Sequence, residues 1–284
     1  MTRRQHRLIG GVGVAIAALC VVGIVEARAQ GQRGAAPAGP PPTPRAVAPA
    51  DFTGTWVAVV TEDWRWRMMT APIGDVSSIP VNAEGRRVTE AWDPAKDVAA
   101  GEQCRAYGAA GIMRLPTRLR ISWQDDNTLK MELDNGTQTR LFHFDAQPQP
   151  PAQPDWQGFS RARWETNAEG QGQAGAAGGV AGGQINPTAN LSGSLRVITT
   201  RMRPGYLRRN GVPYSGNATM TEFFDRTGEP NGDSWFVVTT VVDDPTYLAQ
   251  QLMLTTHFKR EPDGSKFQPR ACEVTPPVVA PPAQ

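Results

Sequence analysis

The stretch Arg118–Asp145, RLRISWQDDNTLKMELDNGTQTRLFHFD, decides the fold. Apolar and polar residues alternate along Arg118–Trp123 and again after residue 128, which is the pattern of strands with one buried face. Asp125–Asn127 marks a turn between these strands, and Asp134–Gly136 marks a tight hairpin because Asn-Gly tolerates positive φ angles. The stretch therefore predicts a meander of three consecutive antiparallel strands.

Strand-like sequence continues on both sides of this meander. The other segments with this character are Thr53–Thr61, Gly158–Thr166, Leu191–Met202, Ala218–Arg226, Ser234–Val242 and Leu248–Arg260. One helix is predicted at Asn82–Trp92, with Asn82 as its N-cap and Pro94 ending it. About nine strands in consecutive order with one short helix predict a mainly β fold, an antiparallel up-and-down barrel.

The motif Phe52–Trp56, FTGTW, opens the first predicted strand. Together with the meander it resembles the Gly-x-Trp opening of lipocalin and fatty-acid-binding (calycin) barrels, and the chain is also similar to secreted bacterial proteins of unassigned function. The lipocalin resemblance implies that Trp56 closes one barrel end and that the lumen holds a small apolar ligand. The chain departs from the family pattern by a long segment between Met69 and Pro116 and by having no obvious C-terminal helix.

Residues 1–29 have the features of an export signal. A cationic start with Arg3 and Arg4 precedes an apolar run, and Ala27–Ala29 provides a small-x-small cleavage site. The sequence therefore predicts a secreted or periplasmic protein with no stable membrane insertion after signal cleavage. Thr2–Arg4 resembles the start of a twin-arginine signal, whereas Gln5–Arg7 departs from its usual apolar continuation, so the export route stays open.

The remaining chain divides by composition. Residues 30–50 are rich in Pro, Ala and Gly and predict a disordered tether, and residues 274–284 predict a disordered Pro-rich tail. Residues 51–273 form a single predicted barrel domain, interrupted by a flexible Gly-rich insertion at 167–190. Only Cys104 and Cys272 remain after signal removal, and in an oxidising compartment they most simply form one disulfide; a free thiol pair is the alternative.

Charge and motif content exclude several function classes. The 29 basic and 27 acidic residues nearly balance, which argues against nucleic-acid binding. The histidine and cysteine spacings match no metal motif, and no nucleophile elbow or phosphate-binding loop is present, so neither a metal nor a cofactor is predicted. A small-molecule ligand is the expected partner, and the oligomeric state stays open.

Two clusters provide candidate ligand-binding residues. The Gly/Pro-shaped segment 201–214 is rich in guanidinium groups, which bind carboxylates or phosphates through paired hydrogen bonds. In segment 62–69, read as extended, tryptophans share one face and could line a pocket. Trp56 and Phe224, outside the two clusters, would add apolar walls to a binding site. The candidate ligand-binding residues are therefore Trp56, Glu62, Trp64, Trp66, Arg203, Tyr206, Arg208, Tyr214 and Phe224. The alternatives are a solvated hairpin tip for the first cluster and an amphipathic strand with aromatic packing for the second.

The leading hypothesis is an exported soluble barrel that binds a small amphipathic or anionic organic ligand in its lumen. One rival is a barrel enzyme of the lyase, isomerase or hydrolase type, with His143 or His257 as the base and Glu222 as its partner. Another rival is an interaction module of the cell envelope. The sequence leaves open whether any reaction is catalysed.

Overall fold

The structure, a computed structural model, describes residues 41–144, 149–166 and 193–278. The predicted export signal, the first part of the tether, the Gly-rich insertion and the last six residues of the tail lie outside the described residues. The chain divides into two compact units, Met1–Pro42 and Thr43–Gln284, and the following description concerns the second unit.

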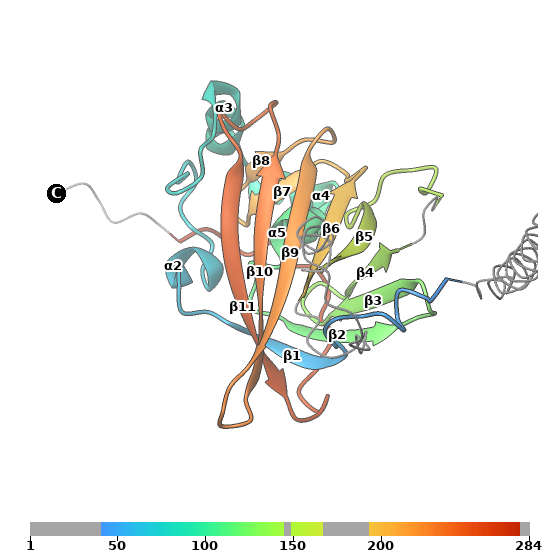
Figure 1. Ribbon diagram of the computed structural model, residues 1–284. Coiled ribbons are helices and arrows are strands. Elements are labelled where there is room, and N and C mark those ends of the chain that lie inside the picture. Colours follow the sequence, from blue (N-terminus) through green and yellow to red (C-terminus); the bar gives the residue numbers. More distant parts are fainter. Residues whose placement is uncertain (1–40, 145–148, 167–192, 279–284) are drawn as a thin grey trace, which may run out of the picture. The chain divides into compact units, whose positions relative to one another are not determined.

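Nine strands of this unit close into a barrel, which confirms the predicted mainly β fold (Figure 1). The strands are β1 (Gly54–Val59), β2 (Arg118–Trp123), β3 (Thr128–Leu133), β4 (Gln138–His143), β5 (Phe159–Thr166), β6 (Gly193–Thr200), β9 (Thr219–Gly228), β10 (Ser234–Asp243) and β11 (Leu252–Glu261). Their order around the barrel is β1-β11-β10-β9-β6-β5-β4-β3-β2. The predicted meander is the β2–β3–β4 part of this wall.

One strand pair differs from the antiparallel prediction. β4 and β5 are parallel, with Phe142 opposite Ser160 and His143 opposite Arg161. A parallel pair requires the connection to travel back along the barrel before the next strand begins, which a hairpin turn cannot do. The barrel is therefore mostly antiparallel rather than wholly so.

The hairpin between β3 and β4 has the backbone that its sequence predicts. Gly136 adopts a φ of 82°, which is in the left-handed region. A Cβ atom at this position would lie 2.4 Å from Cδ1 of Tyr107, so the turn needs glycine for space as well as for conformation.

The segment between β1 and β2 contains more helix than the sequence predicts. Its helices are α2 (Trp64–Arg67), α3 (Ala83–Glu90), α4 (Pro94–Ala99), η1 (Gln103–Tyr107) and α5 (Ala109–Ile112). The predicted helix is confirmed as α3, where the Asn82 side chain accepts a hydrogen bond from Gly85 N–H (2.9 Å). The extended reading of segment 62–69 is wrong, because Asp63 has a left-handed φ of 55° and turns the chain into α2.

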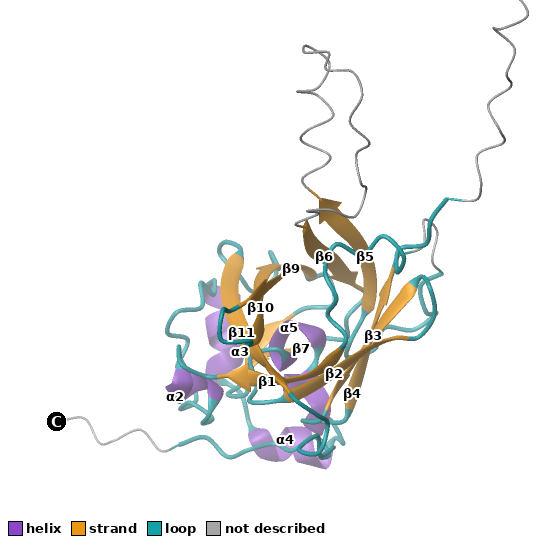
Figure 2. Cartoon of the chain, turned by 60° about the horizontal axis from the view of Figure 1, so that its bottom comes forward, coloured by secondary structure: helices purple, strands orange, loops and turns teal. Residues whose placement is uncertain are grey.

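A small hairpin joins these helices to the barrel. Its strands are β7 (Gly205–Arg208) and β8 (Val212–Tyr214), inserted between β6 and β9. η1 and α5 pack against β7, and α3 packs against β8. Figure 2 shows α5 beside β7. The assembly and one end of the barrel share a second apolar cluster, in which Leu207 and Val212 of the hairpin pack with Leu252 of β11.

Aromatic side chains fill the interior of the barrel. Trp56 is fully buried, its indole N–H donates to Phe52 O (2.9 Å), and its ring lies 4.7 Å from that of Phe236. Phe236 stacks in turn on Phe258 at 4.8 Å, and Phe224 is also buried in this core. Burial of several aromatic rings supplies much of the driving force for closing the barrel.

The predicted disulfide is present between Cys104 in η1 and Cys272 after β11, with a Cα–Cα distance of 5.1 Å. The chain that follows it makes further contacts: Tyr107 Oη donates to Glu273 O (3.1 Å), and Val278 N–H donates to Thr70 O (2.9 Å). These contacts place residues 273–278 along the helical segment. At the other end of the unit, the Trp164 indole N–H donates to Pro44 O (2.8 Å).

Candidate anion-binding site

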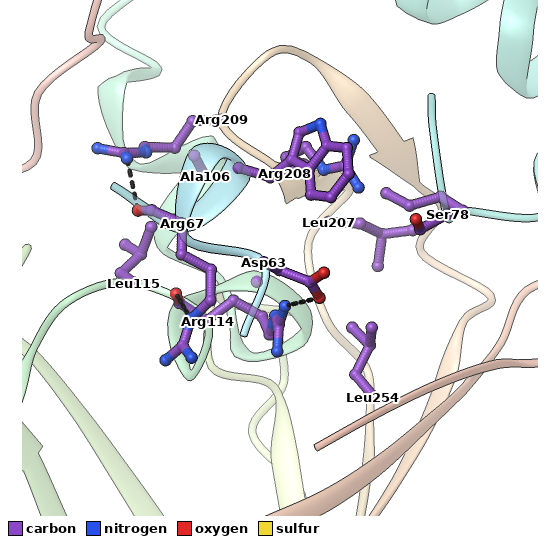
Figure 3. A pocket seen from close by; sticks show the side chains of 13 residues that line it. Asp63, Arg67, Ser78, Ala106, Arg114, Leu115, Leu207, Arg208, Arg209 and Leu254 are labelled. Carbon is purple, nitrogen blue, oxygen red and sulfur yellow. Dashed lines mark hydrogen bonds and ion pairs between the residues drawn. The ribbon is translucent and has the colours of Figure 1, made fainter. Parts of the chain in front are cut away.

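A small pocket lies between α2, α5, β7 and β11, and four arginines line it (Figure 3). We call it the arginine pocket and define it by Arg67, Arg114, Arg208 and Arg209. Its volume of about 30 Å³ has room for a few atoms, enough for the head group of a ligand but not for a whole organic molecule.

Arg67 is held at the back of this pocket by α2. Its side chain is 1% exposed, its Nε donates to Arg114 O (3.0 Å) and its Nη1 donates to Glu62 Oε1 (2.7 Å). Its buried Nη2 has no hydrogen-bond partner among the described residues. Burial, assisted by the charge of Arg114, lowers the pKa of Arg67 to about 10, although Glu62 and Asp63 act in the opposite direction.

Arg208 and Arg209 follow one another at the turn of the β7–β8 hairpin. Arg208 Nη2 donates to Ser77 O (2.7 Å) and its guanidinium lies 5.1 Å from the centre of the Trp66 ring, while Arg209 Nη2 donates to Arg67 O (2.7 Å). Burial lowers the pKa of Arg208 to about 10 and also lowers that of Arg209. Within the described ranges, neither arginine has a carboxylate oxygen within 4.0 Å.

Carboxylates partly offset the positive charge of the four arginines. Arg114 Nη2 donates to Asp63 Oδ2 (2.6 Å), a contact visible in Figure 3, and Arg114 Nη1 donates to Thr255 O (2.7 Å). Glu62 pairs with Arg67 and lies 3.7 Å from Arg114. The charge of Asp75 also acts on Arg208, so four guanidiniums less three carboxylates leave an excess of one positive charge around a partly buried space. Buried charge without a counter-ion is costly, so the arrangement favours binding of an anion.

The structure brings three of the predicted ligand residues to this pocket. Trp66 and Arg208 line it, and Glu62 contacts it through Arg67. The Trp66 indole N–H donates to Asp75 Oδ2 (3.1 Å), which fixes the ring beneath the Arg208 guanidinium.

Two other predicted residues lie in a neighbouring polar cluster. Arg203 donates to both carboxylate oxygens of Glu102 (2.9 and 3.1 Å). Tyr206 Oη donates to Asp97 Oδ2 (2.9 Å) and accepts from Arg105 Nη1 (3.2 Å). The pKa of Tyr206 is raised to about 12, chiefly by burial and also by Asp97, while Arg105 acts to lower it. The polar groups of Arg203 and Tyr206 are thus already hydrogen bonded within this cluster.

The remaining predicted ligand residues occupy either the core or the surface. Trp56, Phe224 and Tyr214 are at most 1% exposed and pack inside the two apolar clusters. Burial raises the pKa of Tyr214 above its ordinary range. Trp64 lies on the outer side of α2 and is 58% exposed.

The structure does not bring either candidate histidine to Glu222. Glu222 faces the barrel interior, fully buried, and accepts hydrogen bonds from both terminal nitrogens of Arg140 (3.0 and 2.5 Å). His143 is next to the buried Phe142 on β4, and His257 is next to the buried Phe258 on β11. Since neighbouring side chains of a strand point to opposite faces, both imidazole rings lie on the outer face of the barrel. His143 stacks on Phe159, and His257 lies beside Glu62.

Sequence reasoning missed Arg67 and Arg114 as parts of the site. In an extended segment 62–69, Arg67 would lie on the face opposite the tryptophans, whereas in the helix α2 its side chain is buried. Arg114 lies in the long segment before β2, where no periodic pattern marks the position of a side chain. No signal in the sequence joins either residue to Arg208.

Comparison of the chain with models of known families, with curated proteins and with solved structures finds no match. Among the described residues no group of three or more His, Cys, Asp or Glu side chains is arranged to hold a metal ion. The helices of the described ranges are all too short or too polar to cross a membrane.

Proposed function

We propose that the barrel binds a small amphipathic organic anion, with its anionic head group in the arginine pocket. The observation that carries this proposal is the pair Arg208 and Arg209, whose partly buried guanidiniums hydrogen bond, among the described residues, only to backbone carbonyl groups. A carboxylate, sulfonate or phosphate would supply the counter-charge and accept charge-assisted hydrogen bonds in the geometry that guanidinium forks favour.

The pocket walls support an amphipathic rather than a purely inorganic ligand. Leu115, Leu207 and Leu254 line the same space as the arginines. Since the volume encloses only a head group, the apolar part of the ligand extends from the pocket. The barrel interior is filled by side chains such as Trp56 and Phe236, so this proposal places the ligand at the arginine pocket instead of between them.

Export is part of the proposal. The Cys104–Cys272 disulfide is consistent with an oxidising compartment, where such bonds persist. Together with the signal-like residues 1–29, it supports a secreted or periplasmic protein that meets its ligand outside the cytoplasm. The resemblance to lipocalins, which bind small apolar ligands, supports the same class of function.

Calorimetric titration with 1-octanesulfonate, an anion that stays ionised at all accessible pH values, tests the proposal. We expect measurable binding to the unmodified protein and a loss of affinity of at least about tenfold in Arg208→Gln and in Arg209→Gln, since a hydrogen bond to a charged group contributes about 1.5–3 kcal/mol. Arg87→Gln is the matched control, because Arg87 is exposed and already paired with Glu84 (2.6 Å).

The control should bind as the unmodified protein does. Thermal unfolding of each variant shows whether the fold is intact. If the folded Arg208→Gln and Arg209→Gln variants bind the sulfonate as well as the Arg87→Gln control, the arginine pocket is not the site.

A further inference from the structure

An imidazole lies beside the counter-ion of the arginine pocket. His257 Nδ1 is 3.6 Å from Glu62 Oε2, and the side chain of His257 is 40% exposed. The Nδ1 atom itself is buried and has no hydrogen-bond partner in the part of the chain that the structure describes. The contact follows from the fold, because β1 pairs with β11 so that Val59, three residues before Glu62, is opposite His257.

Glu62 connects this imidazole to the pocket. Its Oε1 accepts from Arg67 Nη1 (2.7 Å) and lies 3.7 Å from Arg114 Nη1, while its Oε2 faces His257. Burial acts to raise the pKa of Glu62, but hydrogen bonds from the backbone and Thr61, with the charges of Arg67 and His257, lower it overall. Glu62 is therefore ionised near neutral pH, with one carboxylate oxygen toward the arginines and the other toward His257.

Charged groups from several elements lie near His257. Glu62 and Asp63 follow β1, Arg67 is in α2, and Arg114 follows α5. Lys259 is on β11 and pairs with Asp233 in the turn before β10. The flanking residues on β1 and β10, Val59 and Val237, carry no charge. Histidine is the side-chain type whose ordinary pKa places its change of charge between about pH 5 and 8.

We propose that His257 sets the net charge of the arginine pocket through Glu62, so that the pocket binds organic anions more tightly when His257 is protonated. While the imidazole is neutral, Glu62 offsets the charge of Arg67 and Arg114. A protonated imidazole adds one positive charge and takes a share of the Glu62 carboxylate, which leaves the arginines less compensated. By linkage, a bound anion must raise the proton affinity of His257 by the same factor. This inference rests on the proposed function.

Titration with 1-octanesulfonate at about pH 5.5 and about pH 8, on either side of the usual histidine pKa, tests this inference. We expect binding about fivefold tighter at the lower pH, the lower end of the range for coupled sites. His257→Gln should bind with nearly the same affinity at both pH values. His143→Gln is the matched control, because His143 stacks on Phe159 at 5.4 Å and should leave the pH dependence unchanged.

A second measurement does not depend on a variant. In proton NMR the ring signals of His257, assigned by their absence in His257→Gln, should titrate at higher pH when the sulfonate is present, and those of His143 should not move. Equal affinity of the unmodified protein at the two pH values, or an unchanged pH dependence in folded His257→Gln, would overturn this inference and leave the proposed function standing. Absence of binding at both pH values would overturn the proposed function and the inference together.

Discussion

Replacing both Cys104 and Cys272 by serine will lower the free energy of unfolding by roughly 4–5 kcal/mol in the chain-entropy account of cross-links. The disulfide joins residues 168 positions apart, so the unfolded chain loses much of its freedom when the bond is present. It also anchors residues 273–278 on the helical segment, where Glu273 and Val278 make backbone hydrogen bonds. Guanidinium unfolding of the oxidised protein and of the double variant measures the difference.

Reduction supplies the control for this experiment. Dithiothreitol should destabilise the unmodified protein by the same amount and should not affect the double serine variant. A difference below about 1 kcal/mol between the oxidised protein and the variant would show that the bond does not constrain the unfolded chain as a long loop should.

Glu222→Gln will destabilise the fold by about 3–5 kcal/mol, the usual cost of removing one partner of a buried ion pair. Arg140 and Glu222 are both fully buried and meet across the barrel interior through two hydrogen bonds. Arg140 Nη2 also lies 3.4 Å from Thr199 Oγ1, but this neutral group cannot replace the lost charge. The free energy of unfolding in urea is the measurement.

Two comparisons separate loss of the ion pair from loss of a carboxylate in general. Glu132→Gln removes a partly exposed carboxylate paired with Lys130 on β3 and should cost less than about 1 kcal/mol. The paired replacement of Arg140 by Met and Glu222 by Leu should recover most of the lost stability, because no buried charge is left alone. If Glu222→Gln costs no more than Glu132→Gln, the buried pair does not stabilise the fold in the way described.

Most strands of the barrel could be predicted because the sequence patterns that specify them lie within each strand and turn. Alternation along Arg118–Trp123 and the turn at Asp134–Gly136 specify strands and a reversal without reference to distant residues. The direction of β5 relative to β4 is not local, since it depends on how the intervening connection crosses the barrel. The disulfide was predictable only because two cysteines remain once the signal is set aside.

Helix α2 shows how a local pattern can mislead. Trp64 and Trp66 alternate with arginines, which fits a strand, yet four residues are too few to distinguish a period of two from a single helical turn. The left-handed backbone at Asp63 decides the outcome. This changes which residues reach the proposed site, because the helix buries Arg67 and exposes Trp64.

The site could be predicted only in part. Arg208 and Trp66 stood out as members of clusters rich in arginine or tryptophan, but the pocket also needs Arg67 and Arg114, which come from other parts of the chain. Likewise, the alternation of β4 places Arg140 on the buried face with Phe142, but only the structure supplies its partner 82 residues later. Long-range pairing of charges leaves no mark in a single sequence.

A crystal structure of the protein with bound 1-octanesulfonate tests the central claim most directly. We predict the sulfonate oxygens within hydrogen-bond distance of Arg208 and Arg209, with the alkyl chain leaving the pocket past Leu254. A sulfonate bound elsewhere, for example with its chain between Trp56 and Phe224 in the barrel interior, or an arginine pocket without the anion at saturating concentration, would contradict the account.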